Sequence, residues 1–382
     1  MQASGSRIRP DRQRAAVNPL ELFFDLVFVF TITQVAEVVV HHPDLTGIGH
    51  AVLQLAVLGW MFGGYAWLTN AAPATAVWPR YILLGAMAAF FVCALAVPHA
   101  FGADGIVFGV SYLAVVVLHA WGLLLGATPM AAVLRLARFN LASAALILGA
   151  GFVTGPLDWA LWGGAILFQM LTPLWSKANR GFHVAAMHFA ERHGLMMLIV
   201  MGESLISVGL AATASAAHAT PALLLGALAG LAAAVAMWWA YFVREDERAA
   251  HAFEQAGERQ RVNQGLLGYG LAHLIMIFGI IFVAAATKIS LRELLSPMPM
   301  FGAWLMAAGC ALYLIGGATF RWALQYASPL PRLGGAVFSV VVAPAGLFGS
   351  PAAALAAATM VIAATLGAER LIDRSGLELV EQ

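Results

Sequence analysis

Charged residues are scarce in this chain of 382 residues. Lys, Arg, Asp and Glu together make up 10% of it, whereas a soluble protein has about 25%. Cysteine is nearly absent as well, since Cys93 and Cys310 are the only two. Both lie inside apolar runs, so we expect packed thiols rather than a disulfide or a metal site.

Motifs that define several enzyme classes are missing too. The chain has no Walker-type phosphate loop, no zincin motif and no G-x-S-x-G nucleophile elbow. ATP-driven transport by this chain alone is therefore not expected. The formal net charge of +1 gives no reason to expect a nucleic-acid partner, and no cofactor is indicated.

Apolar residues dominate what is present, at 62% of the chain. They form runs of about 20 residues, each long enough to cross about 30 Å of hydrocarbon as a helix. Only helices and closed barrels span lipid, and these runs lack the alternation of barrel strands. The sequence therefore predicts an all-α polytopic membrane protein with about 12 transmembrane helices. The expected spans are 19–40, 49–70, 80–98, 105–126, 136–154, 158–175, 191–212, 221–243, 265–287, 301–320, 332–349 and 351–368.

The distribution of cations supports this count. Cytoplasmic loops carry the Lys and Arg residues of membrane proteins. With these spans, every cation except Lys288 and Arg292 falls on one side. Both termini are then expected in the cytoplasm. A basic tail followed by a full-length span also predicts an uncleaved anchor rather than a signal peptide.

The expected organisation is a basic cytoplasmic tail over 1–18, two six-helix halves and a cytoplasmic tail over 369–382. The halves cover 19–175 and 191–368, and a cytoplasmic linker over 176–190 joins them. Inside the second half, segment 244–264 alternates in charge sign, which is typical of a solvated helix.

A weak internal similarity relates the two halves. Aligning Glu21 with Glu191 places Gln34 against Ser204, and an even number of spans separates the two segments. The halves would then share one orientation, as in the parallel repeats of some transporters. A 6+6 parallel repeat is therefore a hypothesis.

Carboxylates inside apolar runs are the costliest side chains here. Glu21 and Asp25 lie on one helix face, one turn apart. Glu203 lies about 18 Å beyond Glu191 along its span, near mid-membrane, so it must be protonated or paired. Such a group suits a proton carrier, although a structural hydrogen bond remains an alternative.

For Glu21 and Asp25 the alternatives are pairing with Arg14, Arg192 or a lipid amine, or complementing the positive end of the first helix. The candidates for proton transfer or acid–base chemistry are Asp25, Glu21, Glu203, Glu191 and His193.

The candidates for substrate binding are His273, Ser204, Ser207, Gln34 and Asn70. His273 suits a hydrogen bond between helices or a proton relay, and Asn70 suits a helix cap.

Other residues have weaker indications. His188, Glu191 and His193 have spacing too weak to predict a metal site. The candidates for anchors at the membrane interface are Trp60, Trp67, Trp238, Trp239 and Tyr241, and for Trp238 and Trp239 this role is the expected one. Helix breakers can mark a transporter binding site, although Gly and Pro are also common in membrane helices generally. Those in or at the ends of spans are Pro98, Pro173, Pro344 and the Gly pairs 63–64, 163–164 and 316–317.

Two segments resemble one family. They are Leu20-Glu-Leu-Phe-Phe-Asp-Leu-Val-Phe-Val with Gln34-Val-Ala, and His188-Phe-Ala-Glu-Arg-His-Gly-Leu195 with Gly202-Glu-Ser204. The family is the bacterial low-temperature requirement A family. Further matches are Trp60, Trp67, Asn70, Trp238-Trp-Ala-Tyr-Phe242, His273 and Gly279. The resemblance implies a multi-pass protein of the bacterial cytoplasmic (inner) membrane. It implies no reaction, because the family name records a growth phenotype.

Three functions stay open. The first is a proton-coupled secondary transporter of a small molecule, with Glu203, Glu21 and Asp25 as titrating groups. The second is a membrane-embedded enzyme that uses carboxylate and histidine groups as acids and bases on a lipid or isoprenoid. The third is a structural membrane protein that acts in cold or envelope stress. Membrane lipid and a small-molecule or lipid substrate are the expected partners, and a homo-oligomer is left open. The most informative observation about these functions is whether Asp25, Glu203 and His273 line one water-filled cavity.

Overall fold

The computed structural model describes residues 17–71, 77–126, 129–176, 184–215, 218, 220–290 and 296–378. Within these ranges it contains helices and no strand. Residues 1–16 of the expected tail 1–18, Arg14 among them, lie outside the described residues. The same holds for Lys177, Arg180 and Arg292.

The helices described in the N-terminal part follow the apolar runs closely. They are α2 (Pro19–His41), α3 (Leu45–Ala71), α4 (Val77–Ala96), η1 (Val97–His99), α5 (Gly105–Leu125), α6 (Met130–Ala150) and α7 (Pro156–Ser176). Local signals explain where α2 begins, because Asn18 and Glu21 form a capping box and Pro19 occupies the first turn.

The remaining described helices include a π-helical turn and a short 3-10 helix, η4. They are α8 (Ala186–Ser215), α9 (Pro221–Phe242), α10 (Glu245–Gln255), α11 (Glu258–Gln264), the π-helical turn η2 (Gly265–Ala272), α12 (His273–Ile289), α13 (Met300–Leu324), α14 (Leu330–Phe338), η4 (Ser339–Val341), α15 (Val342–Phe348) and α16 (Pro351–Glu378). Helix α8 begins inside the expected linker 176–190, and α16 continues into the expected tail 369–382.

The prediction of an all-α polytopic membrane fold is confirmed. Among the described residues, 11 helical segments are long and apolar enough to cross a membrane. The expected sixth span corresponds to α7, a helix of 21 residues that is not among those 11. The count of 12 and the 6+6 repeat therefore stay predictions.

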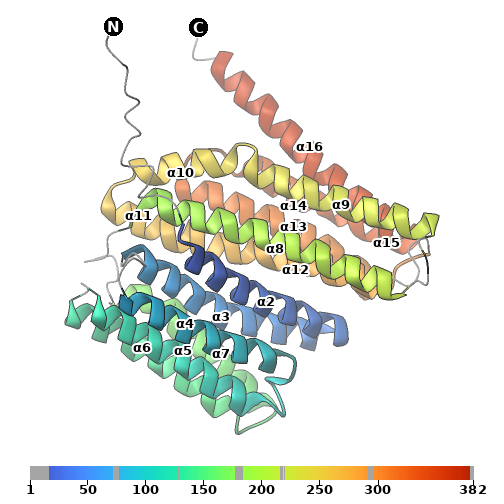
Figure 1. Ribbon diagram of the computed structural model, residues 1–382. Helices are drawn as coiled ribbons and strands as arrows, with labels where there is room; N and C mark the ends of the chain where they lie inside the picture. Colours follow the sequence, from blue (N-terminus) through green and yellow to red (C-terminus); the bar gives the residue numbers. More distant parts are fainter. Residues whose placement is uncertain are drawn as a thin grey trace, which may run out of the picture.

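Helix α2 lies between two groups of helices (Figure 1). It packs against α3 and α4 on one side and against α8 and α12 on the other. Helices α4 to α7 pack as successive neighbours in the first group, and α12 packs against α13 in the second. Helix α2 therefore connects the two groups.

Glycines bring α12 and α13 into close contact. A Cβ atom built on Gly309 would lie 2.8 Å from the Gly279 carbonyl oxygen and from the Val283 nitrogen. Small residues of this kind let two membrane helices approach until their backbones touch. Cys310 is buried on α13, and it and the buried Cys93 are both free thiols, as expected.

Segment 244–264 forms α10 and α11, but its first carboxylate is not solvated. Glu245 is 5% exposed and accepts hydrogen bonds from Arg321 at 2.6 and 2.8 Å and from the Tyr326 hydroxyl at 2.6 Å. Burial raises the pKa of the Tyr326 phenol well above its ordinary value, so the hydroxyl keeps the proton that it donates.

Glu369 of α16 completes this group, which we call the α10 ion cluster: Glu245, Arg321, Tyr326, Arg332 and Glu369. Glu369 lies 2.7 Å from Arg321 and 3.0 Å from Arg332, and Arg332 also lies 3.2 Å from Glu245. Two carboxylates therefore balance two guanidinium groups. The expectation of a solvated face is wrong for Glu245 because those cations compensate its burial.

Candidate functional site

A row of polar side chains runs along α2. Glu21, Asp25, Thr33 and Glu37 are spaced by multiples of four residues, so they form a row that winds slowly around the helix, by about 40° for every four residues. We call these four residues the α2 polar ridge. Each of them contacts a polar partner on α8 or α12. The ridge therefore joins α2 to the second group of helices along most of its length.

At the start of the ridge, Glu21 receives two kinds of hydrogen bond. Its carboxylate accepts from the Asn18 backbone nitrogen at 3.2 Å, as the capping box requires. It also lies 2.9 Å from Nε2 of His188 on α8. Because a carboxylate only accepts, His188 donates through Nε2 and its Nδ1 can accept.

Asn70 supplies the next link of this network. Its Nδ2 lies 3.3 Å from Nδ1 of His188 and donates to the Ala185 carbonyl at 3.0 Å. Its Oδ1 accepts from the Ala185 nitrogen at 2.8 Å. The expectation that Asn70 caps its own helix is therefore wrong, because the side chain crosses from α3 to the start of α8.

One turn further along α2, Asp25 pairs with Arg192 of α8. Their side chains are 0% and 1% exposed, and Nη2 of Arg192 lies 2.7 Å from Oδ1 of Asp25. Arg192 also donates to the Thr69 hydroxyl, and its guanidinium carbon lies 5.6 Å from the ring centroids of Phe24 and Phe62. Of the partners weighed for Asp25, the structure shows Arg192.

The far end of the ridge holds two further contacts. Glu203 of α8 is half-buried and lies 3.1 Å from the Thr33 hydroxyl. Glu37 forms an ion pair of 2.5 Å with Lys288 of α12. Thr33 and Glu37 follow Val29 along α2, whereas Asp25 precedes it. Helix α2 therefore contacts the second group of helices near each of its ends.

Other candidates stand apart from these contacts. Glu191 is exposed on α8, and Gln34 is half-buried on α2. The Ser204 hydroxyl donates to the Val200 carbonyl of its own helix at 2.9 Å. The side chain of Ser207 lies outside the described part of the chain.

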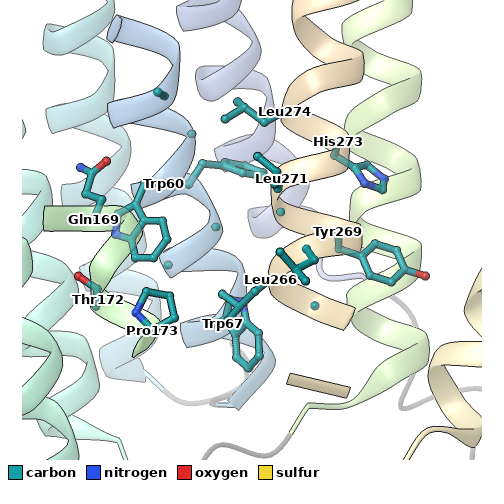
Figure 2. A pocket seen from close by; sticks show the side chains of 18 of the residues that line it. Trp60, Trp67, Gln169, Thr172, Pro173, Leu266, Tyr269, Leu271, His273 and Leu274 are labelled. Carbon is teal, nitrogen blue, oxygen red and sulfur yellow. The ribbon is translucent and has the colours of Figure 1, made fainter. Parts of the chain in front are cut away.

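A cavity of about 290 Å³ lies between the two groups of helices. Its walls come from α3, α5, α6 and α7 on one side and from α8, η2 and α12 on the other, and Phe28 of α2 contributes as well. Figure 2 shows Trp60, Gln169 and Thr172 facing the side that carries Leu266, Leu271 and Leu274. His193 and His273 line the cavity, whereas Asp25 and Glu203 do not.

The structure therefore does not bring Asp25, Glu203 and His273 to one cavity. Asp25 and Glu203 face the seam between α2 and α8, where Arg192 and Thr33 bind them. The cavity lies beside that seam and its wall is mostly apolar.

The two cavity histidines have defined roles in hydrogen bonding. His273 lies 3.0 Å from the Gly268 carbonyl through Nδ1 and 2.8 Å from the Tyr241 hydroxyl through Nε2. A carbonyl only accepts, so Nδ1 donates, and Nε2 of a neutral ring accepts from Tyr241. Tyr241 was a candidate for an interface anchor, but its ring is buried against His273.

His193 lies next to His273, with 5.4 Å between the ring centroids. Its Nδ1 lies 2.8 Å from the Phe189 carbonyl and donates to it. The described residues offer Nε2 no hydrogen-bond partner, so that nitrogen is an acceptor on the cavity wall. Of the acid–base candidates, His193 alone lines the cavity.

Sequence reasoning missed the polar residues on the opposite wall. Trp60 donates to Oδ1 of Asn140 at 3.1 Å, and Gln169 donates to the Tyr112 hydroxyl at 2.7 Å. Asn140, Gln169 and Thr172 were detectable as isolated polar residues in the apolar runs of α6 and α7. Neutral polar side chains cost less in a membrane than charges, so their presence in an apolar run is a weaker indication of function.

Three segments that contain helix-breaking residues or irregular geometry meet at the cavity. The π-helical turn η2, the pair Gly63 and Gly64 on α3, and Pro173 inside α7 all contribute to its wall. The π-helical turn and the proline both interrupt the regular helical ladder of hydrogen bonds. Pro173 and the Gly63–Gly64 pair are two of the helix breakers noted in the sequence, whereas the π-helical turn η2 was not expected.

Within the described ranges, no group of three or more His, Cys, Asp or Glu side chains could hold a metal ion. His188 binds Glu21, and Glu191 is exposed away from His193. The polar groups around the cavity are suited to hydrogen bonding with a ligand.

Comparison with known proteins gives a family. The profile described as bacterial low temperature requirement A protein matches residues 16–367. The chain is also 28% identical over 288 residues to an uncharacterized protein of Rhizobium meliloti (strain 1021), which covers 72% of this chain and 69% of that protein. No solved structure matches the chain.

Proposed function

The chain belongs to the bacterial low temperature requirement A family, and we propose that it is a proton-coupled secondary transporter of a small molecule that binds in the cavity. The observation that carries the proposal is the place of the cavity. It lies between two groups of helices and is lined by interrupted segments of α7 and of the helix that contains η2. Transporters commonly bind substrate at interrupted helices between two such halves.

Glu203 is the proposed proton carrier. The Thr33 hydroxyl lies 3.2 Å from the Val29 carbonyl and 3.1 Å from Oε1 of Glu203. A hydroxyl has one proton to donate. When the Thr33 hydroxyl donates to the Val29 carbonyl, it has no proton left to donate to Glu203. The contact between Thr33 and Glu203 is then a hydrogen bond only if Glu203 is protonated and donates to the Thr33 oxygen. When Glu203 is ionised, Thr33 turns to donate to it and leaves Val29.

The α2 polar ridge can couple the protonation of Glu203 to the shape of the cavity. Glu203 and the cavity residue His193 lie on α8, and Thr33 and the cavity residue Phe28 lie on α2. A change at the Glu203–Thr33 contact therefore acts on two helices that wall the cavity. Opening toward one side of the membrane requires α2 to part from the second group at one end.

Two ion pairs are suited to act as latches in that motion. Asp25–Arg192 ties α2 to α8 near one end of α2, and Glu37–Lys288 ties α2 to α12 near the other. In the proposed topology the protein spans the bacterial inner membrane and both termini lie in the cytoplasm. The distribution of cations supports this topology.

The test uses Glu203→Gln in liposomes with an imposed pH gradient and a trapped pH indicator. We expect added substrate to move protons through the wild-type protein, and the variant to lower that coupled flux by at least about 10-fold, because glutamine cannot release a proton. Candidate substrates come from a panel of uncharged amphipathic compounds. Glu191→Gln is the matched control, since Glu191 is an exposed carboxylate of the same helix.

Equal unfolding temperatures of the three proteins would show that the fold is intact. Undiminished coupled flux in Glu203→Gln, or the same loss in Glu191→Gln, would refute the role of Glu203.

One observation favours a second candidate, a membrane-embedded enzyme that acts on a lipid or isoprenoid. Nε2 of His193 is an acceptor on the cavity wall, in the position that a general base requires. Mass spectrometry of the recovered ligand separates the two candidates, because a transporter returns it chemically unchanged. A structural role in cold or envelope stress predicts instead that carboxylate substitutions alter assembly only.

A further inference from the structure

Among the described residues, none that lines the cavity carries a formal charge. Its lining residues include aromatic rings, aliphatic side chains, imidazoles and amides, but no Asp, Glu, Lys or Arg. A charged ligand would have to leave water without an opposite charge to pair with, which is strongly unfavourable in an apolar site. The wall therefore selects for an uncharged molecule.

The amide of Asn140 presents a donor to the cavity. Its Oδ1 accepts from the Trp60 indole nitrogen at 3.1 Å. An indole N–H can only donate, so the oxygen of the amide must face Trp60. The described residues offer Nδ2 no partner, which leaves two N–H groups for a ligand.

Two acceptors lie on the neighbouring helix α7. Nε2 of Gln169 donates to the Tyr112 hydroxyl at 2.7 Å and to the Ser143 hydroxyl at 3.1 Å. Both of its N–H groups are thus used, and Oε1 remains as an acceptor. The Thr172 hydroxyl donates to the Phe168 carbonyl at 2.7 Å, so its oxygen can also accept.

The rest of the wall is suited to an apolar body. Leu266, Leu271 and Leu274 lie across the cavity from Gln169 and Thr172 (Figure 2). A ligand that fits both sides must donate and accept hydrogen bonds at one end and be apolar elsewhere.

We infer that the cavity binds an uncharged alcohol with an apolar chain, and that its hydroxyl group lies among Asn140, Gln169 and Thr172. A hydroxyl is the smallest group that accepts from the Asn140 amide and donates to either acceptor on α7. This assignment rests on the proposed function only in taking the cavity as the substrate site. It adds the chemical class of the substrate.

The test compares four probes that share a ten-carbon chain: 1-decanol, decyl methyl ether, decanoate and decylammonium. The full chain is placed in lipid nanodiscs, and its unfolding temperature is measured against the concentration of each probe. We expect a saturable rise with 1-decanol at a concentration at least about 10-fold lower than with the other three. The ether can accept a hydrogen bond but cannot donate one, and the two ions meet no opposite charge.

Two variants fill the cavity. Gly63→Leu is suitable because a Cβ atom on Gly63 would meet nothing within 4 Å, and Ala56→Leu is a second variant in the same wall. Gly163→Leu is the matched control, since Gly163 is exposed outside the cavity and a Cβ there also meets nothing within 4 Å. We expect the decanol effect to be lost in whichever cavity variants fold and to be kept in the control.

Asn140→Leu tests the polar end of the cavity. It should weaken the binding of decanol at least about 10-fold, and the binding of decanoate and decylammonium should stay weak. The inference is overturned if either ion binds as tightly as decanol, or if decanol acts equally on the cavity variants and the control. These measurements use no gradient, so loss of coupled flux in Glu203→Gln with decanol binding intact would separate the two proposals.

Discussion

The Asp25–Arg192 pair gives the sharpest prediction about stability. We consider Asp25→Leu, Arg192→Met and the double variant. Each single variant leaves one buried charge without its partner, since the two side chains are 0% and 1% exposed. Thr69 keeps a bond to the Tyr65 carbonyl at 3.1 Å in every case, so no hydroxyl is orphaned when Arg192 is replaced.

The magnitude follows from the contacts that are lost. Nη2 and Nε of Arg192 lie 2.7 Å and 3.2 Å from Oδ1 of Asp25. Removing one member of such a buried pair costs about 3–5 kcal/mol, whereas replacing both members by apolar residues is often neutral or stabilising. We therefore expect each single variant to lose about 3–5 kcal/mol of unfolding free energy and the double variant to be more stable than either.

The measurement is the free energy of unfolding in mixed detergent micelles for the four proteins of the cycle. Arg370→Met serves as the control, since Arg370 is exposed on α16, and we expect a change within about 0.5 kcal/mol. If the double variant loses the sum of the two single losses, the two side chains are not coupled and the reasoning fails.

Two further predictions concern the packing of α13 and the α10 ion cluster. Gly309→Ala should lower the unfolding free energy by about 1–3 kcal/mol because its Cβ would lie 2.8 Å from backbone atoms of α12. Gly163→Ala, in open space, should raise it by about 0.5–1 kcal/mol, and the same sign for both would contradict the packing argument. Tyr326→Phe should cost about 1.5–3 kcal/mol because the hydroxyl donates to the Glu245 carboxylate at 2.6 Å. The control Tyr81→Phe removes an exposed hydroxyl, and an equal loss there would show that the bond to Glu245 adds nothing.

The positions of the helices could be predicted because lipid imposes them. Runs of apolar residues must be about 20 residues long to span the membrane, and local signals such as Thr220 and Pro221 at the start of α9 set the ends. The expected span 221–243 therefore differs little from Pro221–Phe242. The π-helical turn before α12 was not predictable in this way, because Gly265 and its neighbours read as ordinary apolar helix.

The partners of the polar residues could be predicted only in part. The spacing of Glu21 and Asp25 places them on one face, but it does not say which helix they meet. His188 and Arg192 lie 167 residues away in the sequence, and only the packing of α2 against α8 brings them together. Tyr241 shows the same limit, because an aromatic residue at a helix end is expected at the interface unless a partner such as His273 is known.

The α10 ion cluster has a consequence for how the protein is made. Synthesis proceeds from the N-terminus, so Glu245 enters the membrane 76 residues before Arg321, and Glu369 follows Arg332 by 37 residues. Until α16 arrives, two guanidinium groups share one carboxylate, and the nascent protein carries an excess positive charge at a buried position. The last helix neutralises it. Insertion of α16 thus balances the charge of the α10 ion cluster. A chain whose synthesis stops before α16 keeps one more buried guanidinium group than buried carboxylates in that cluster.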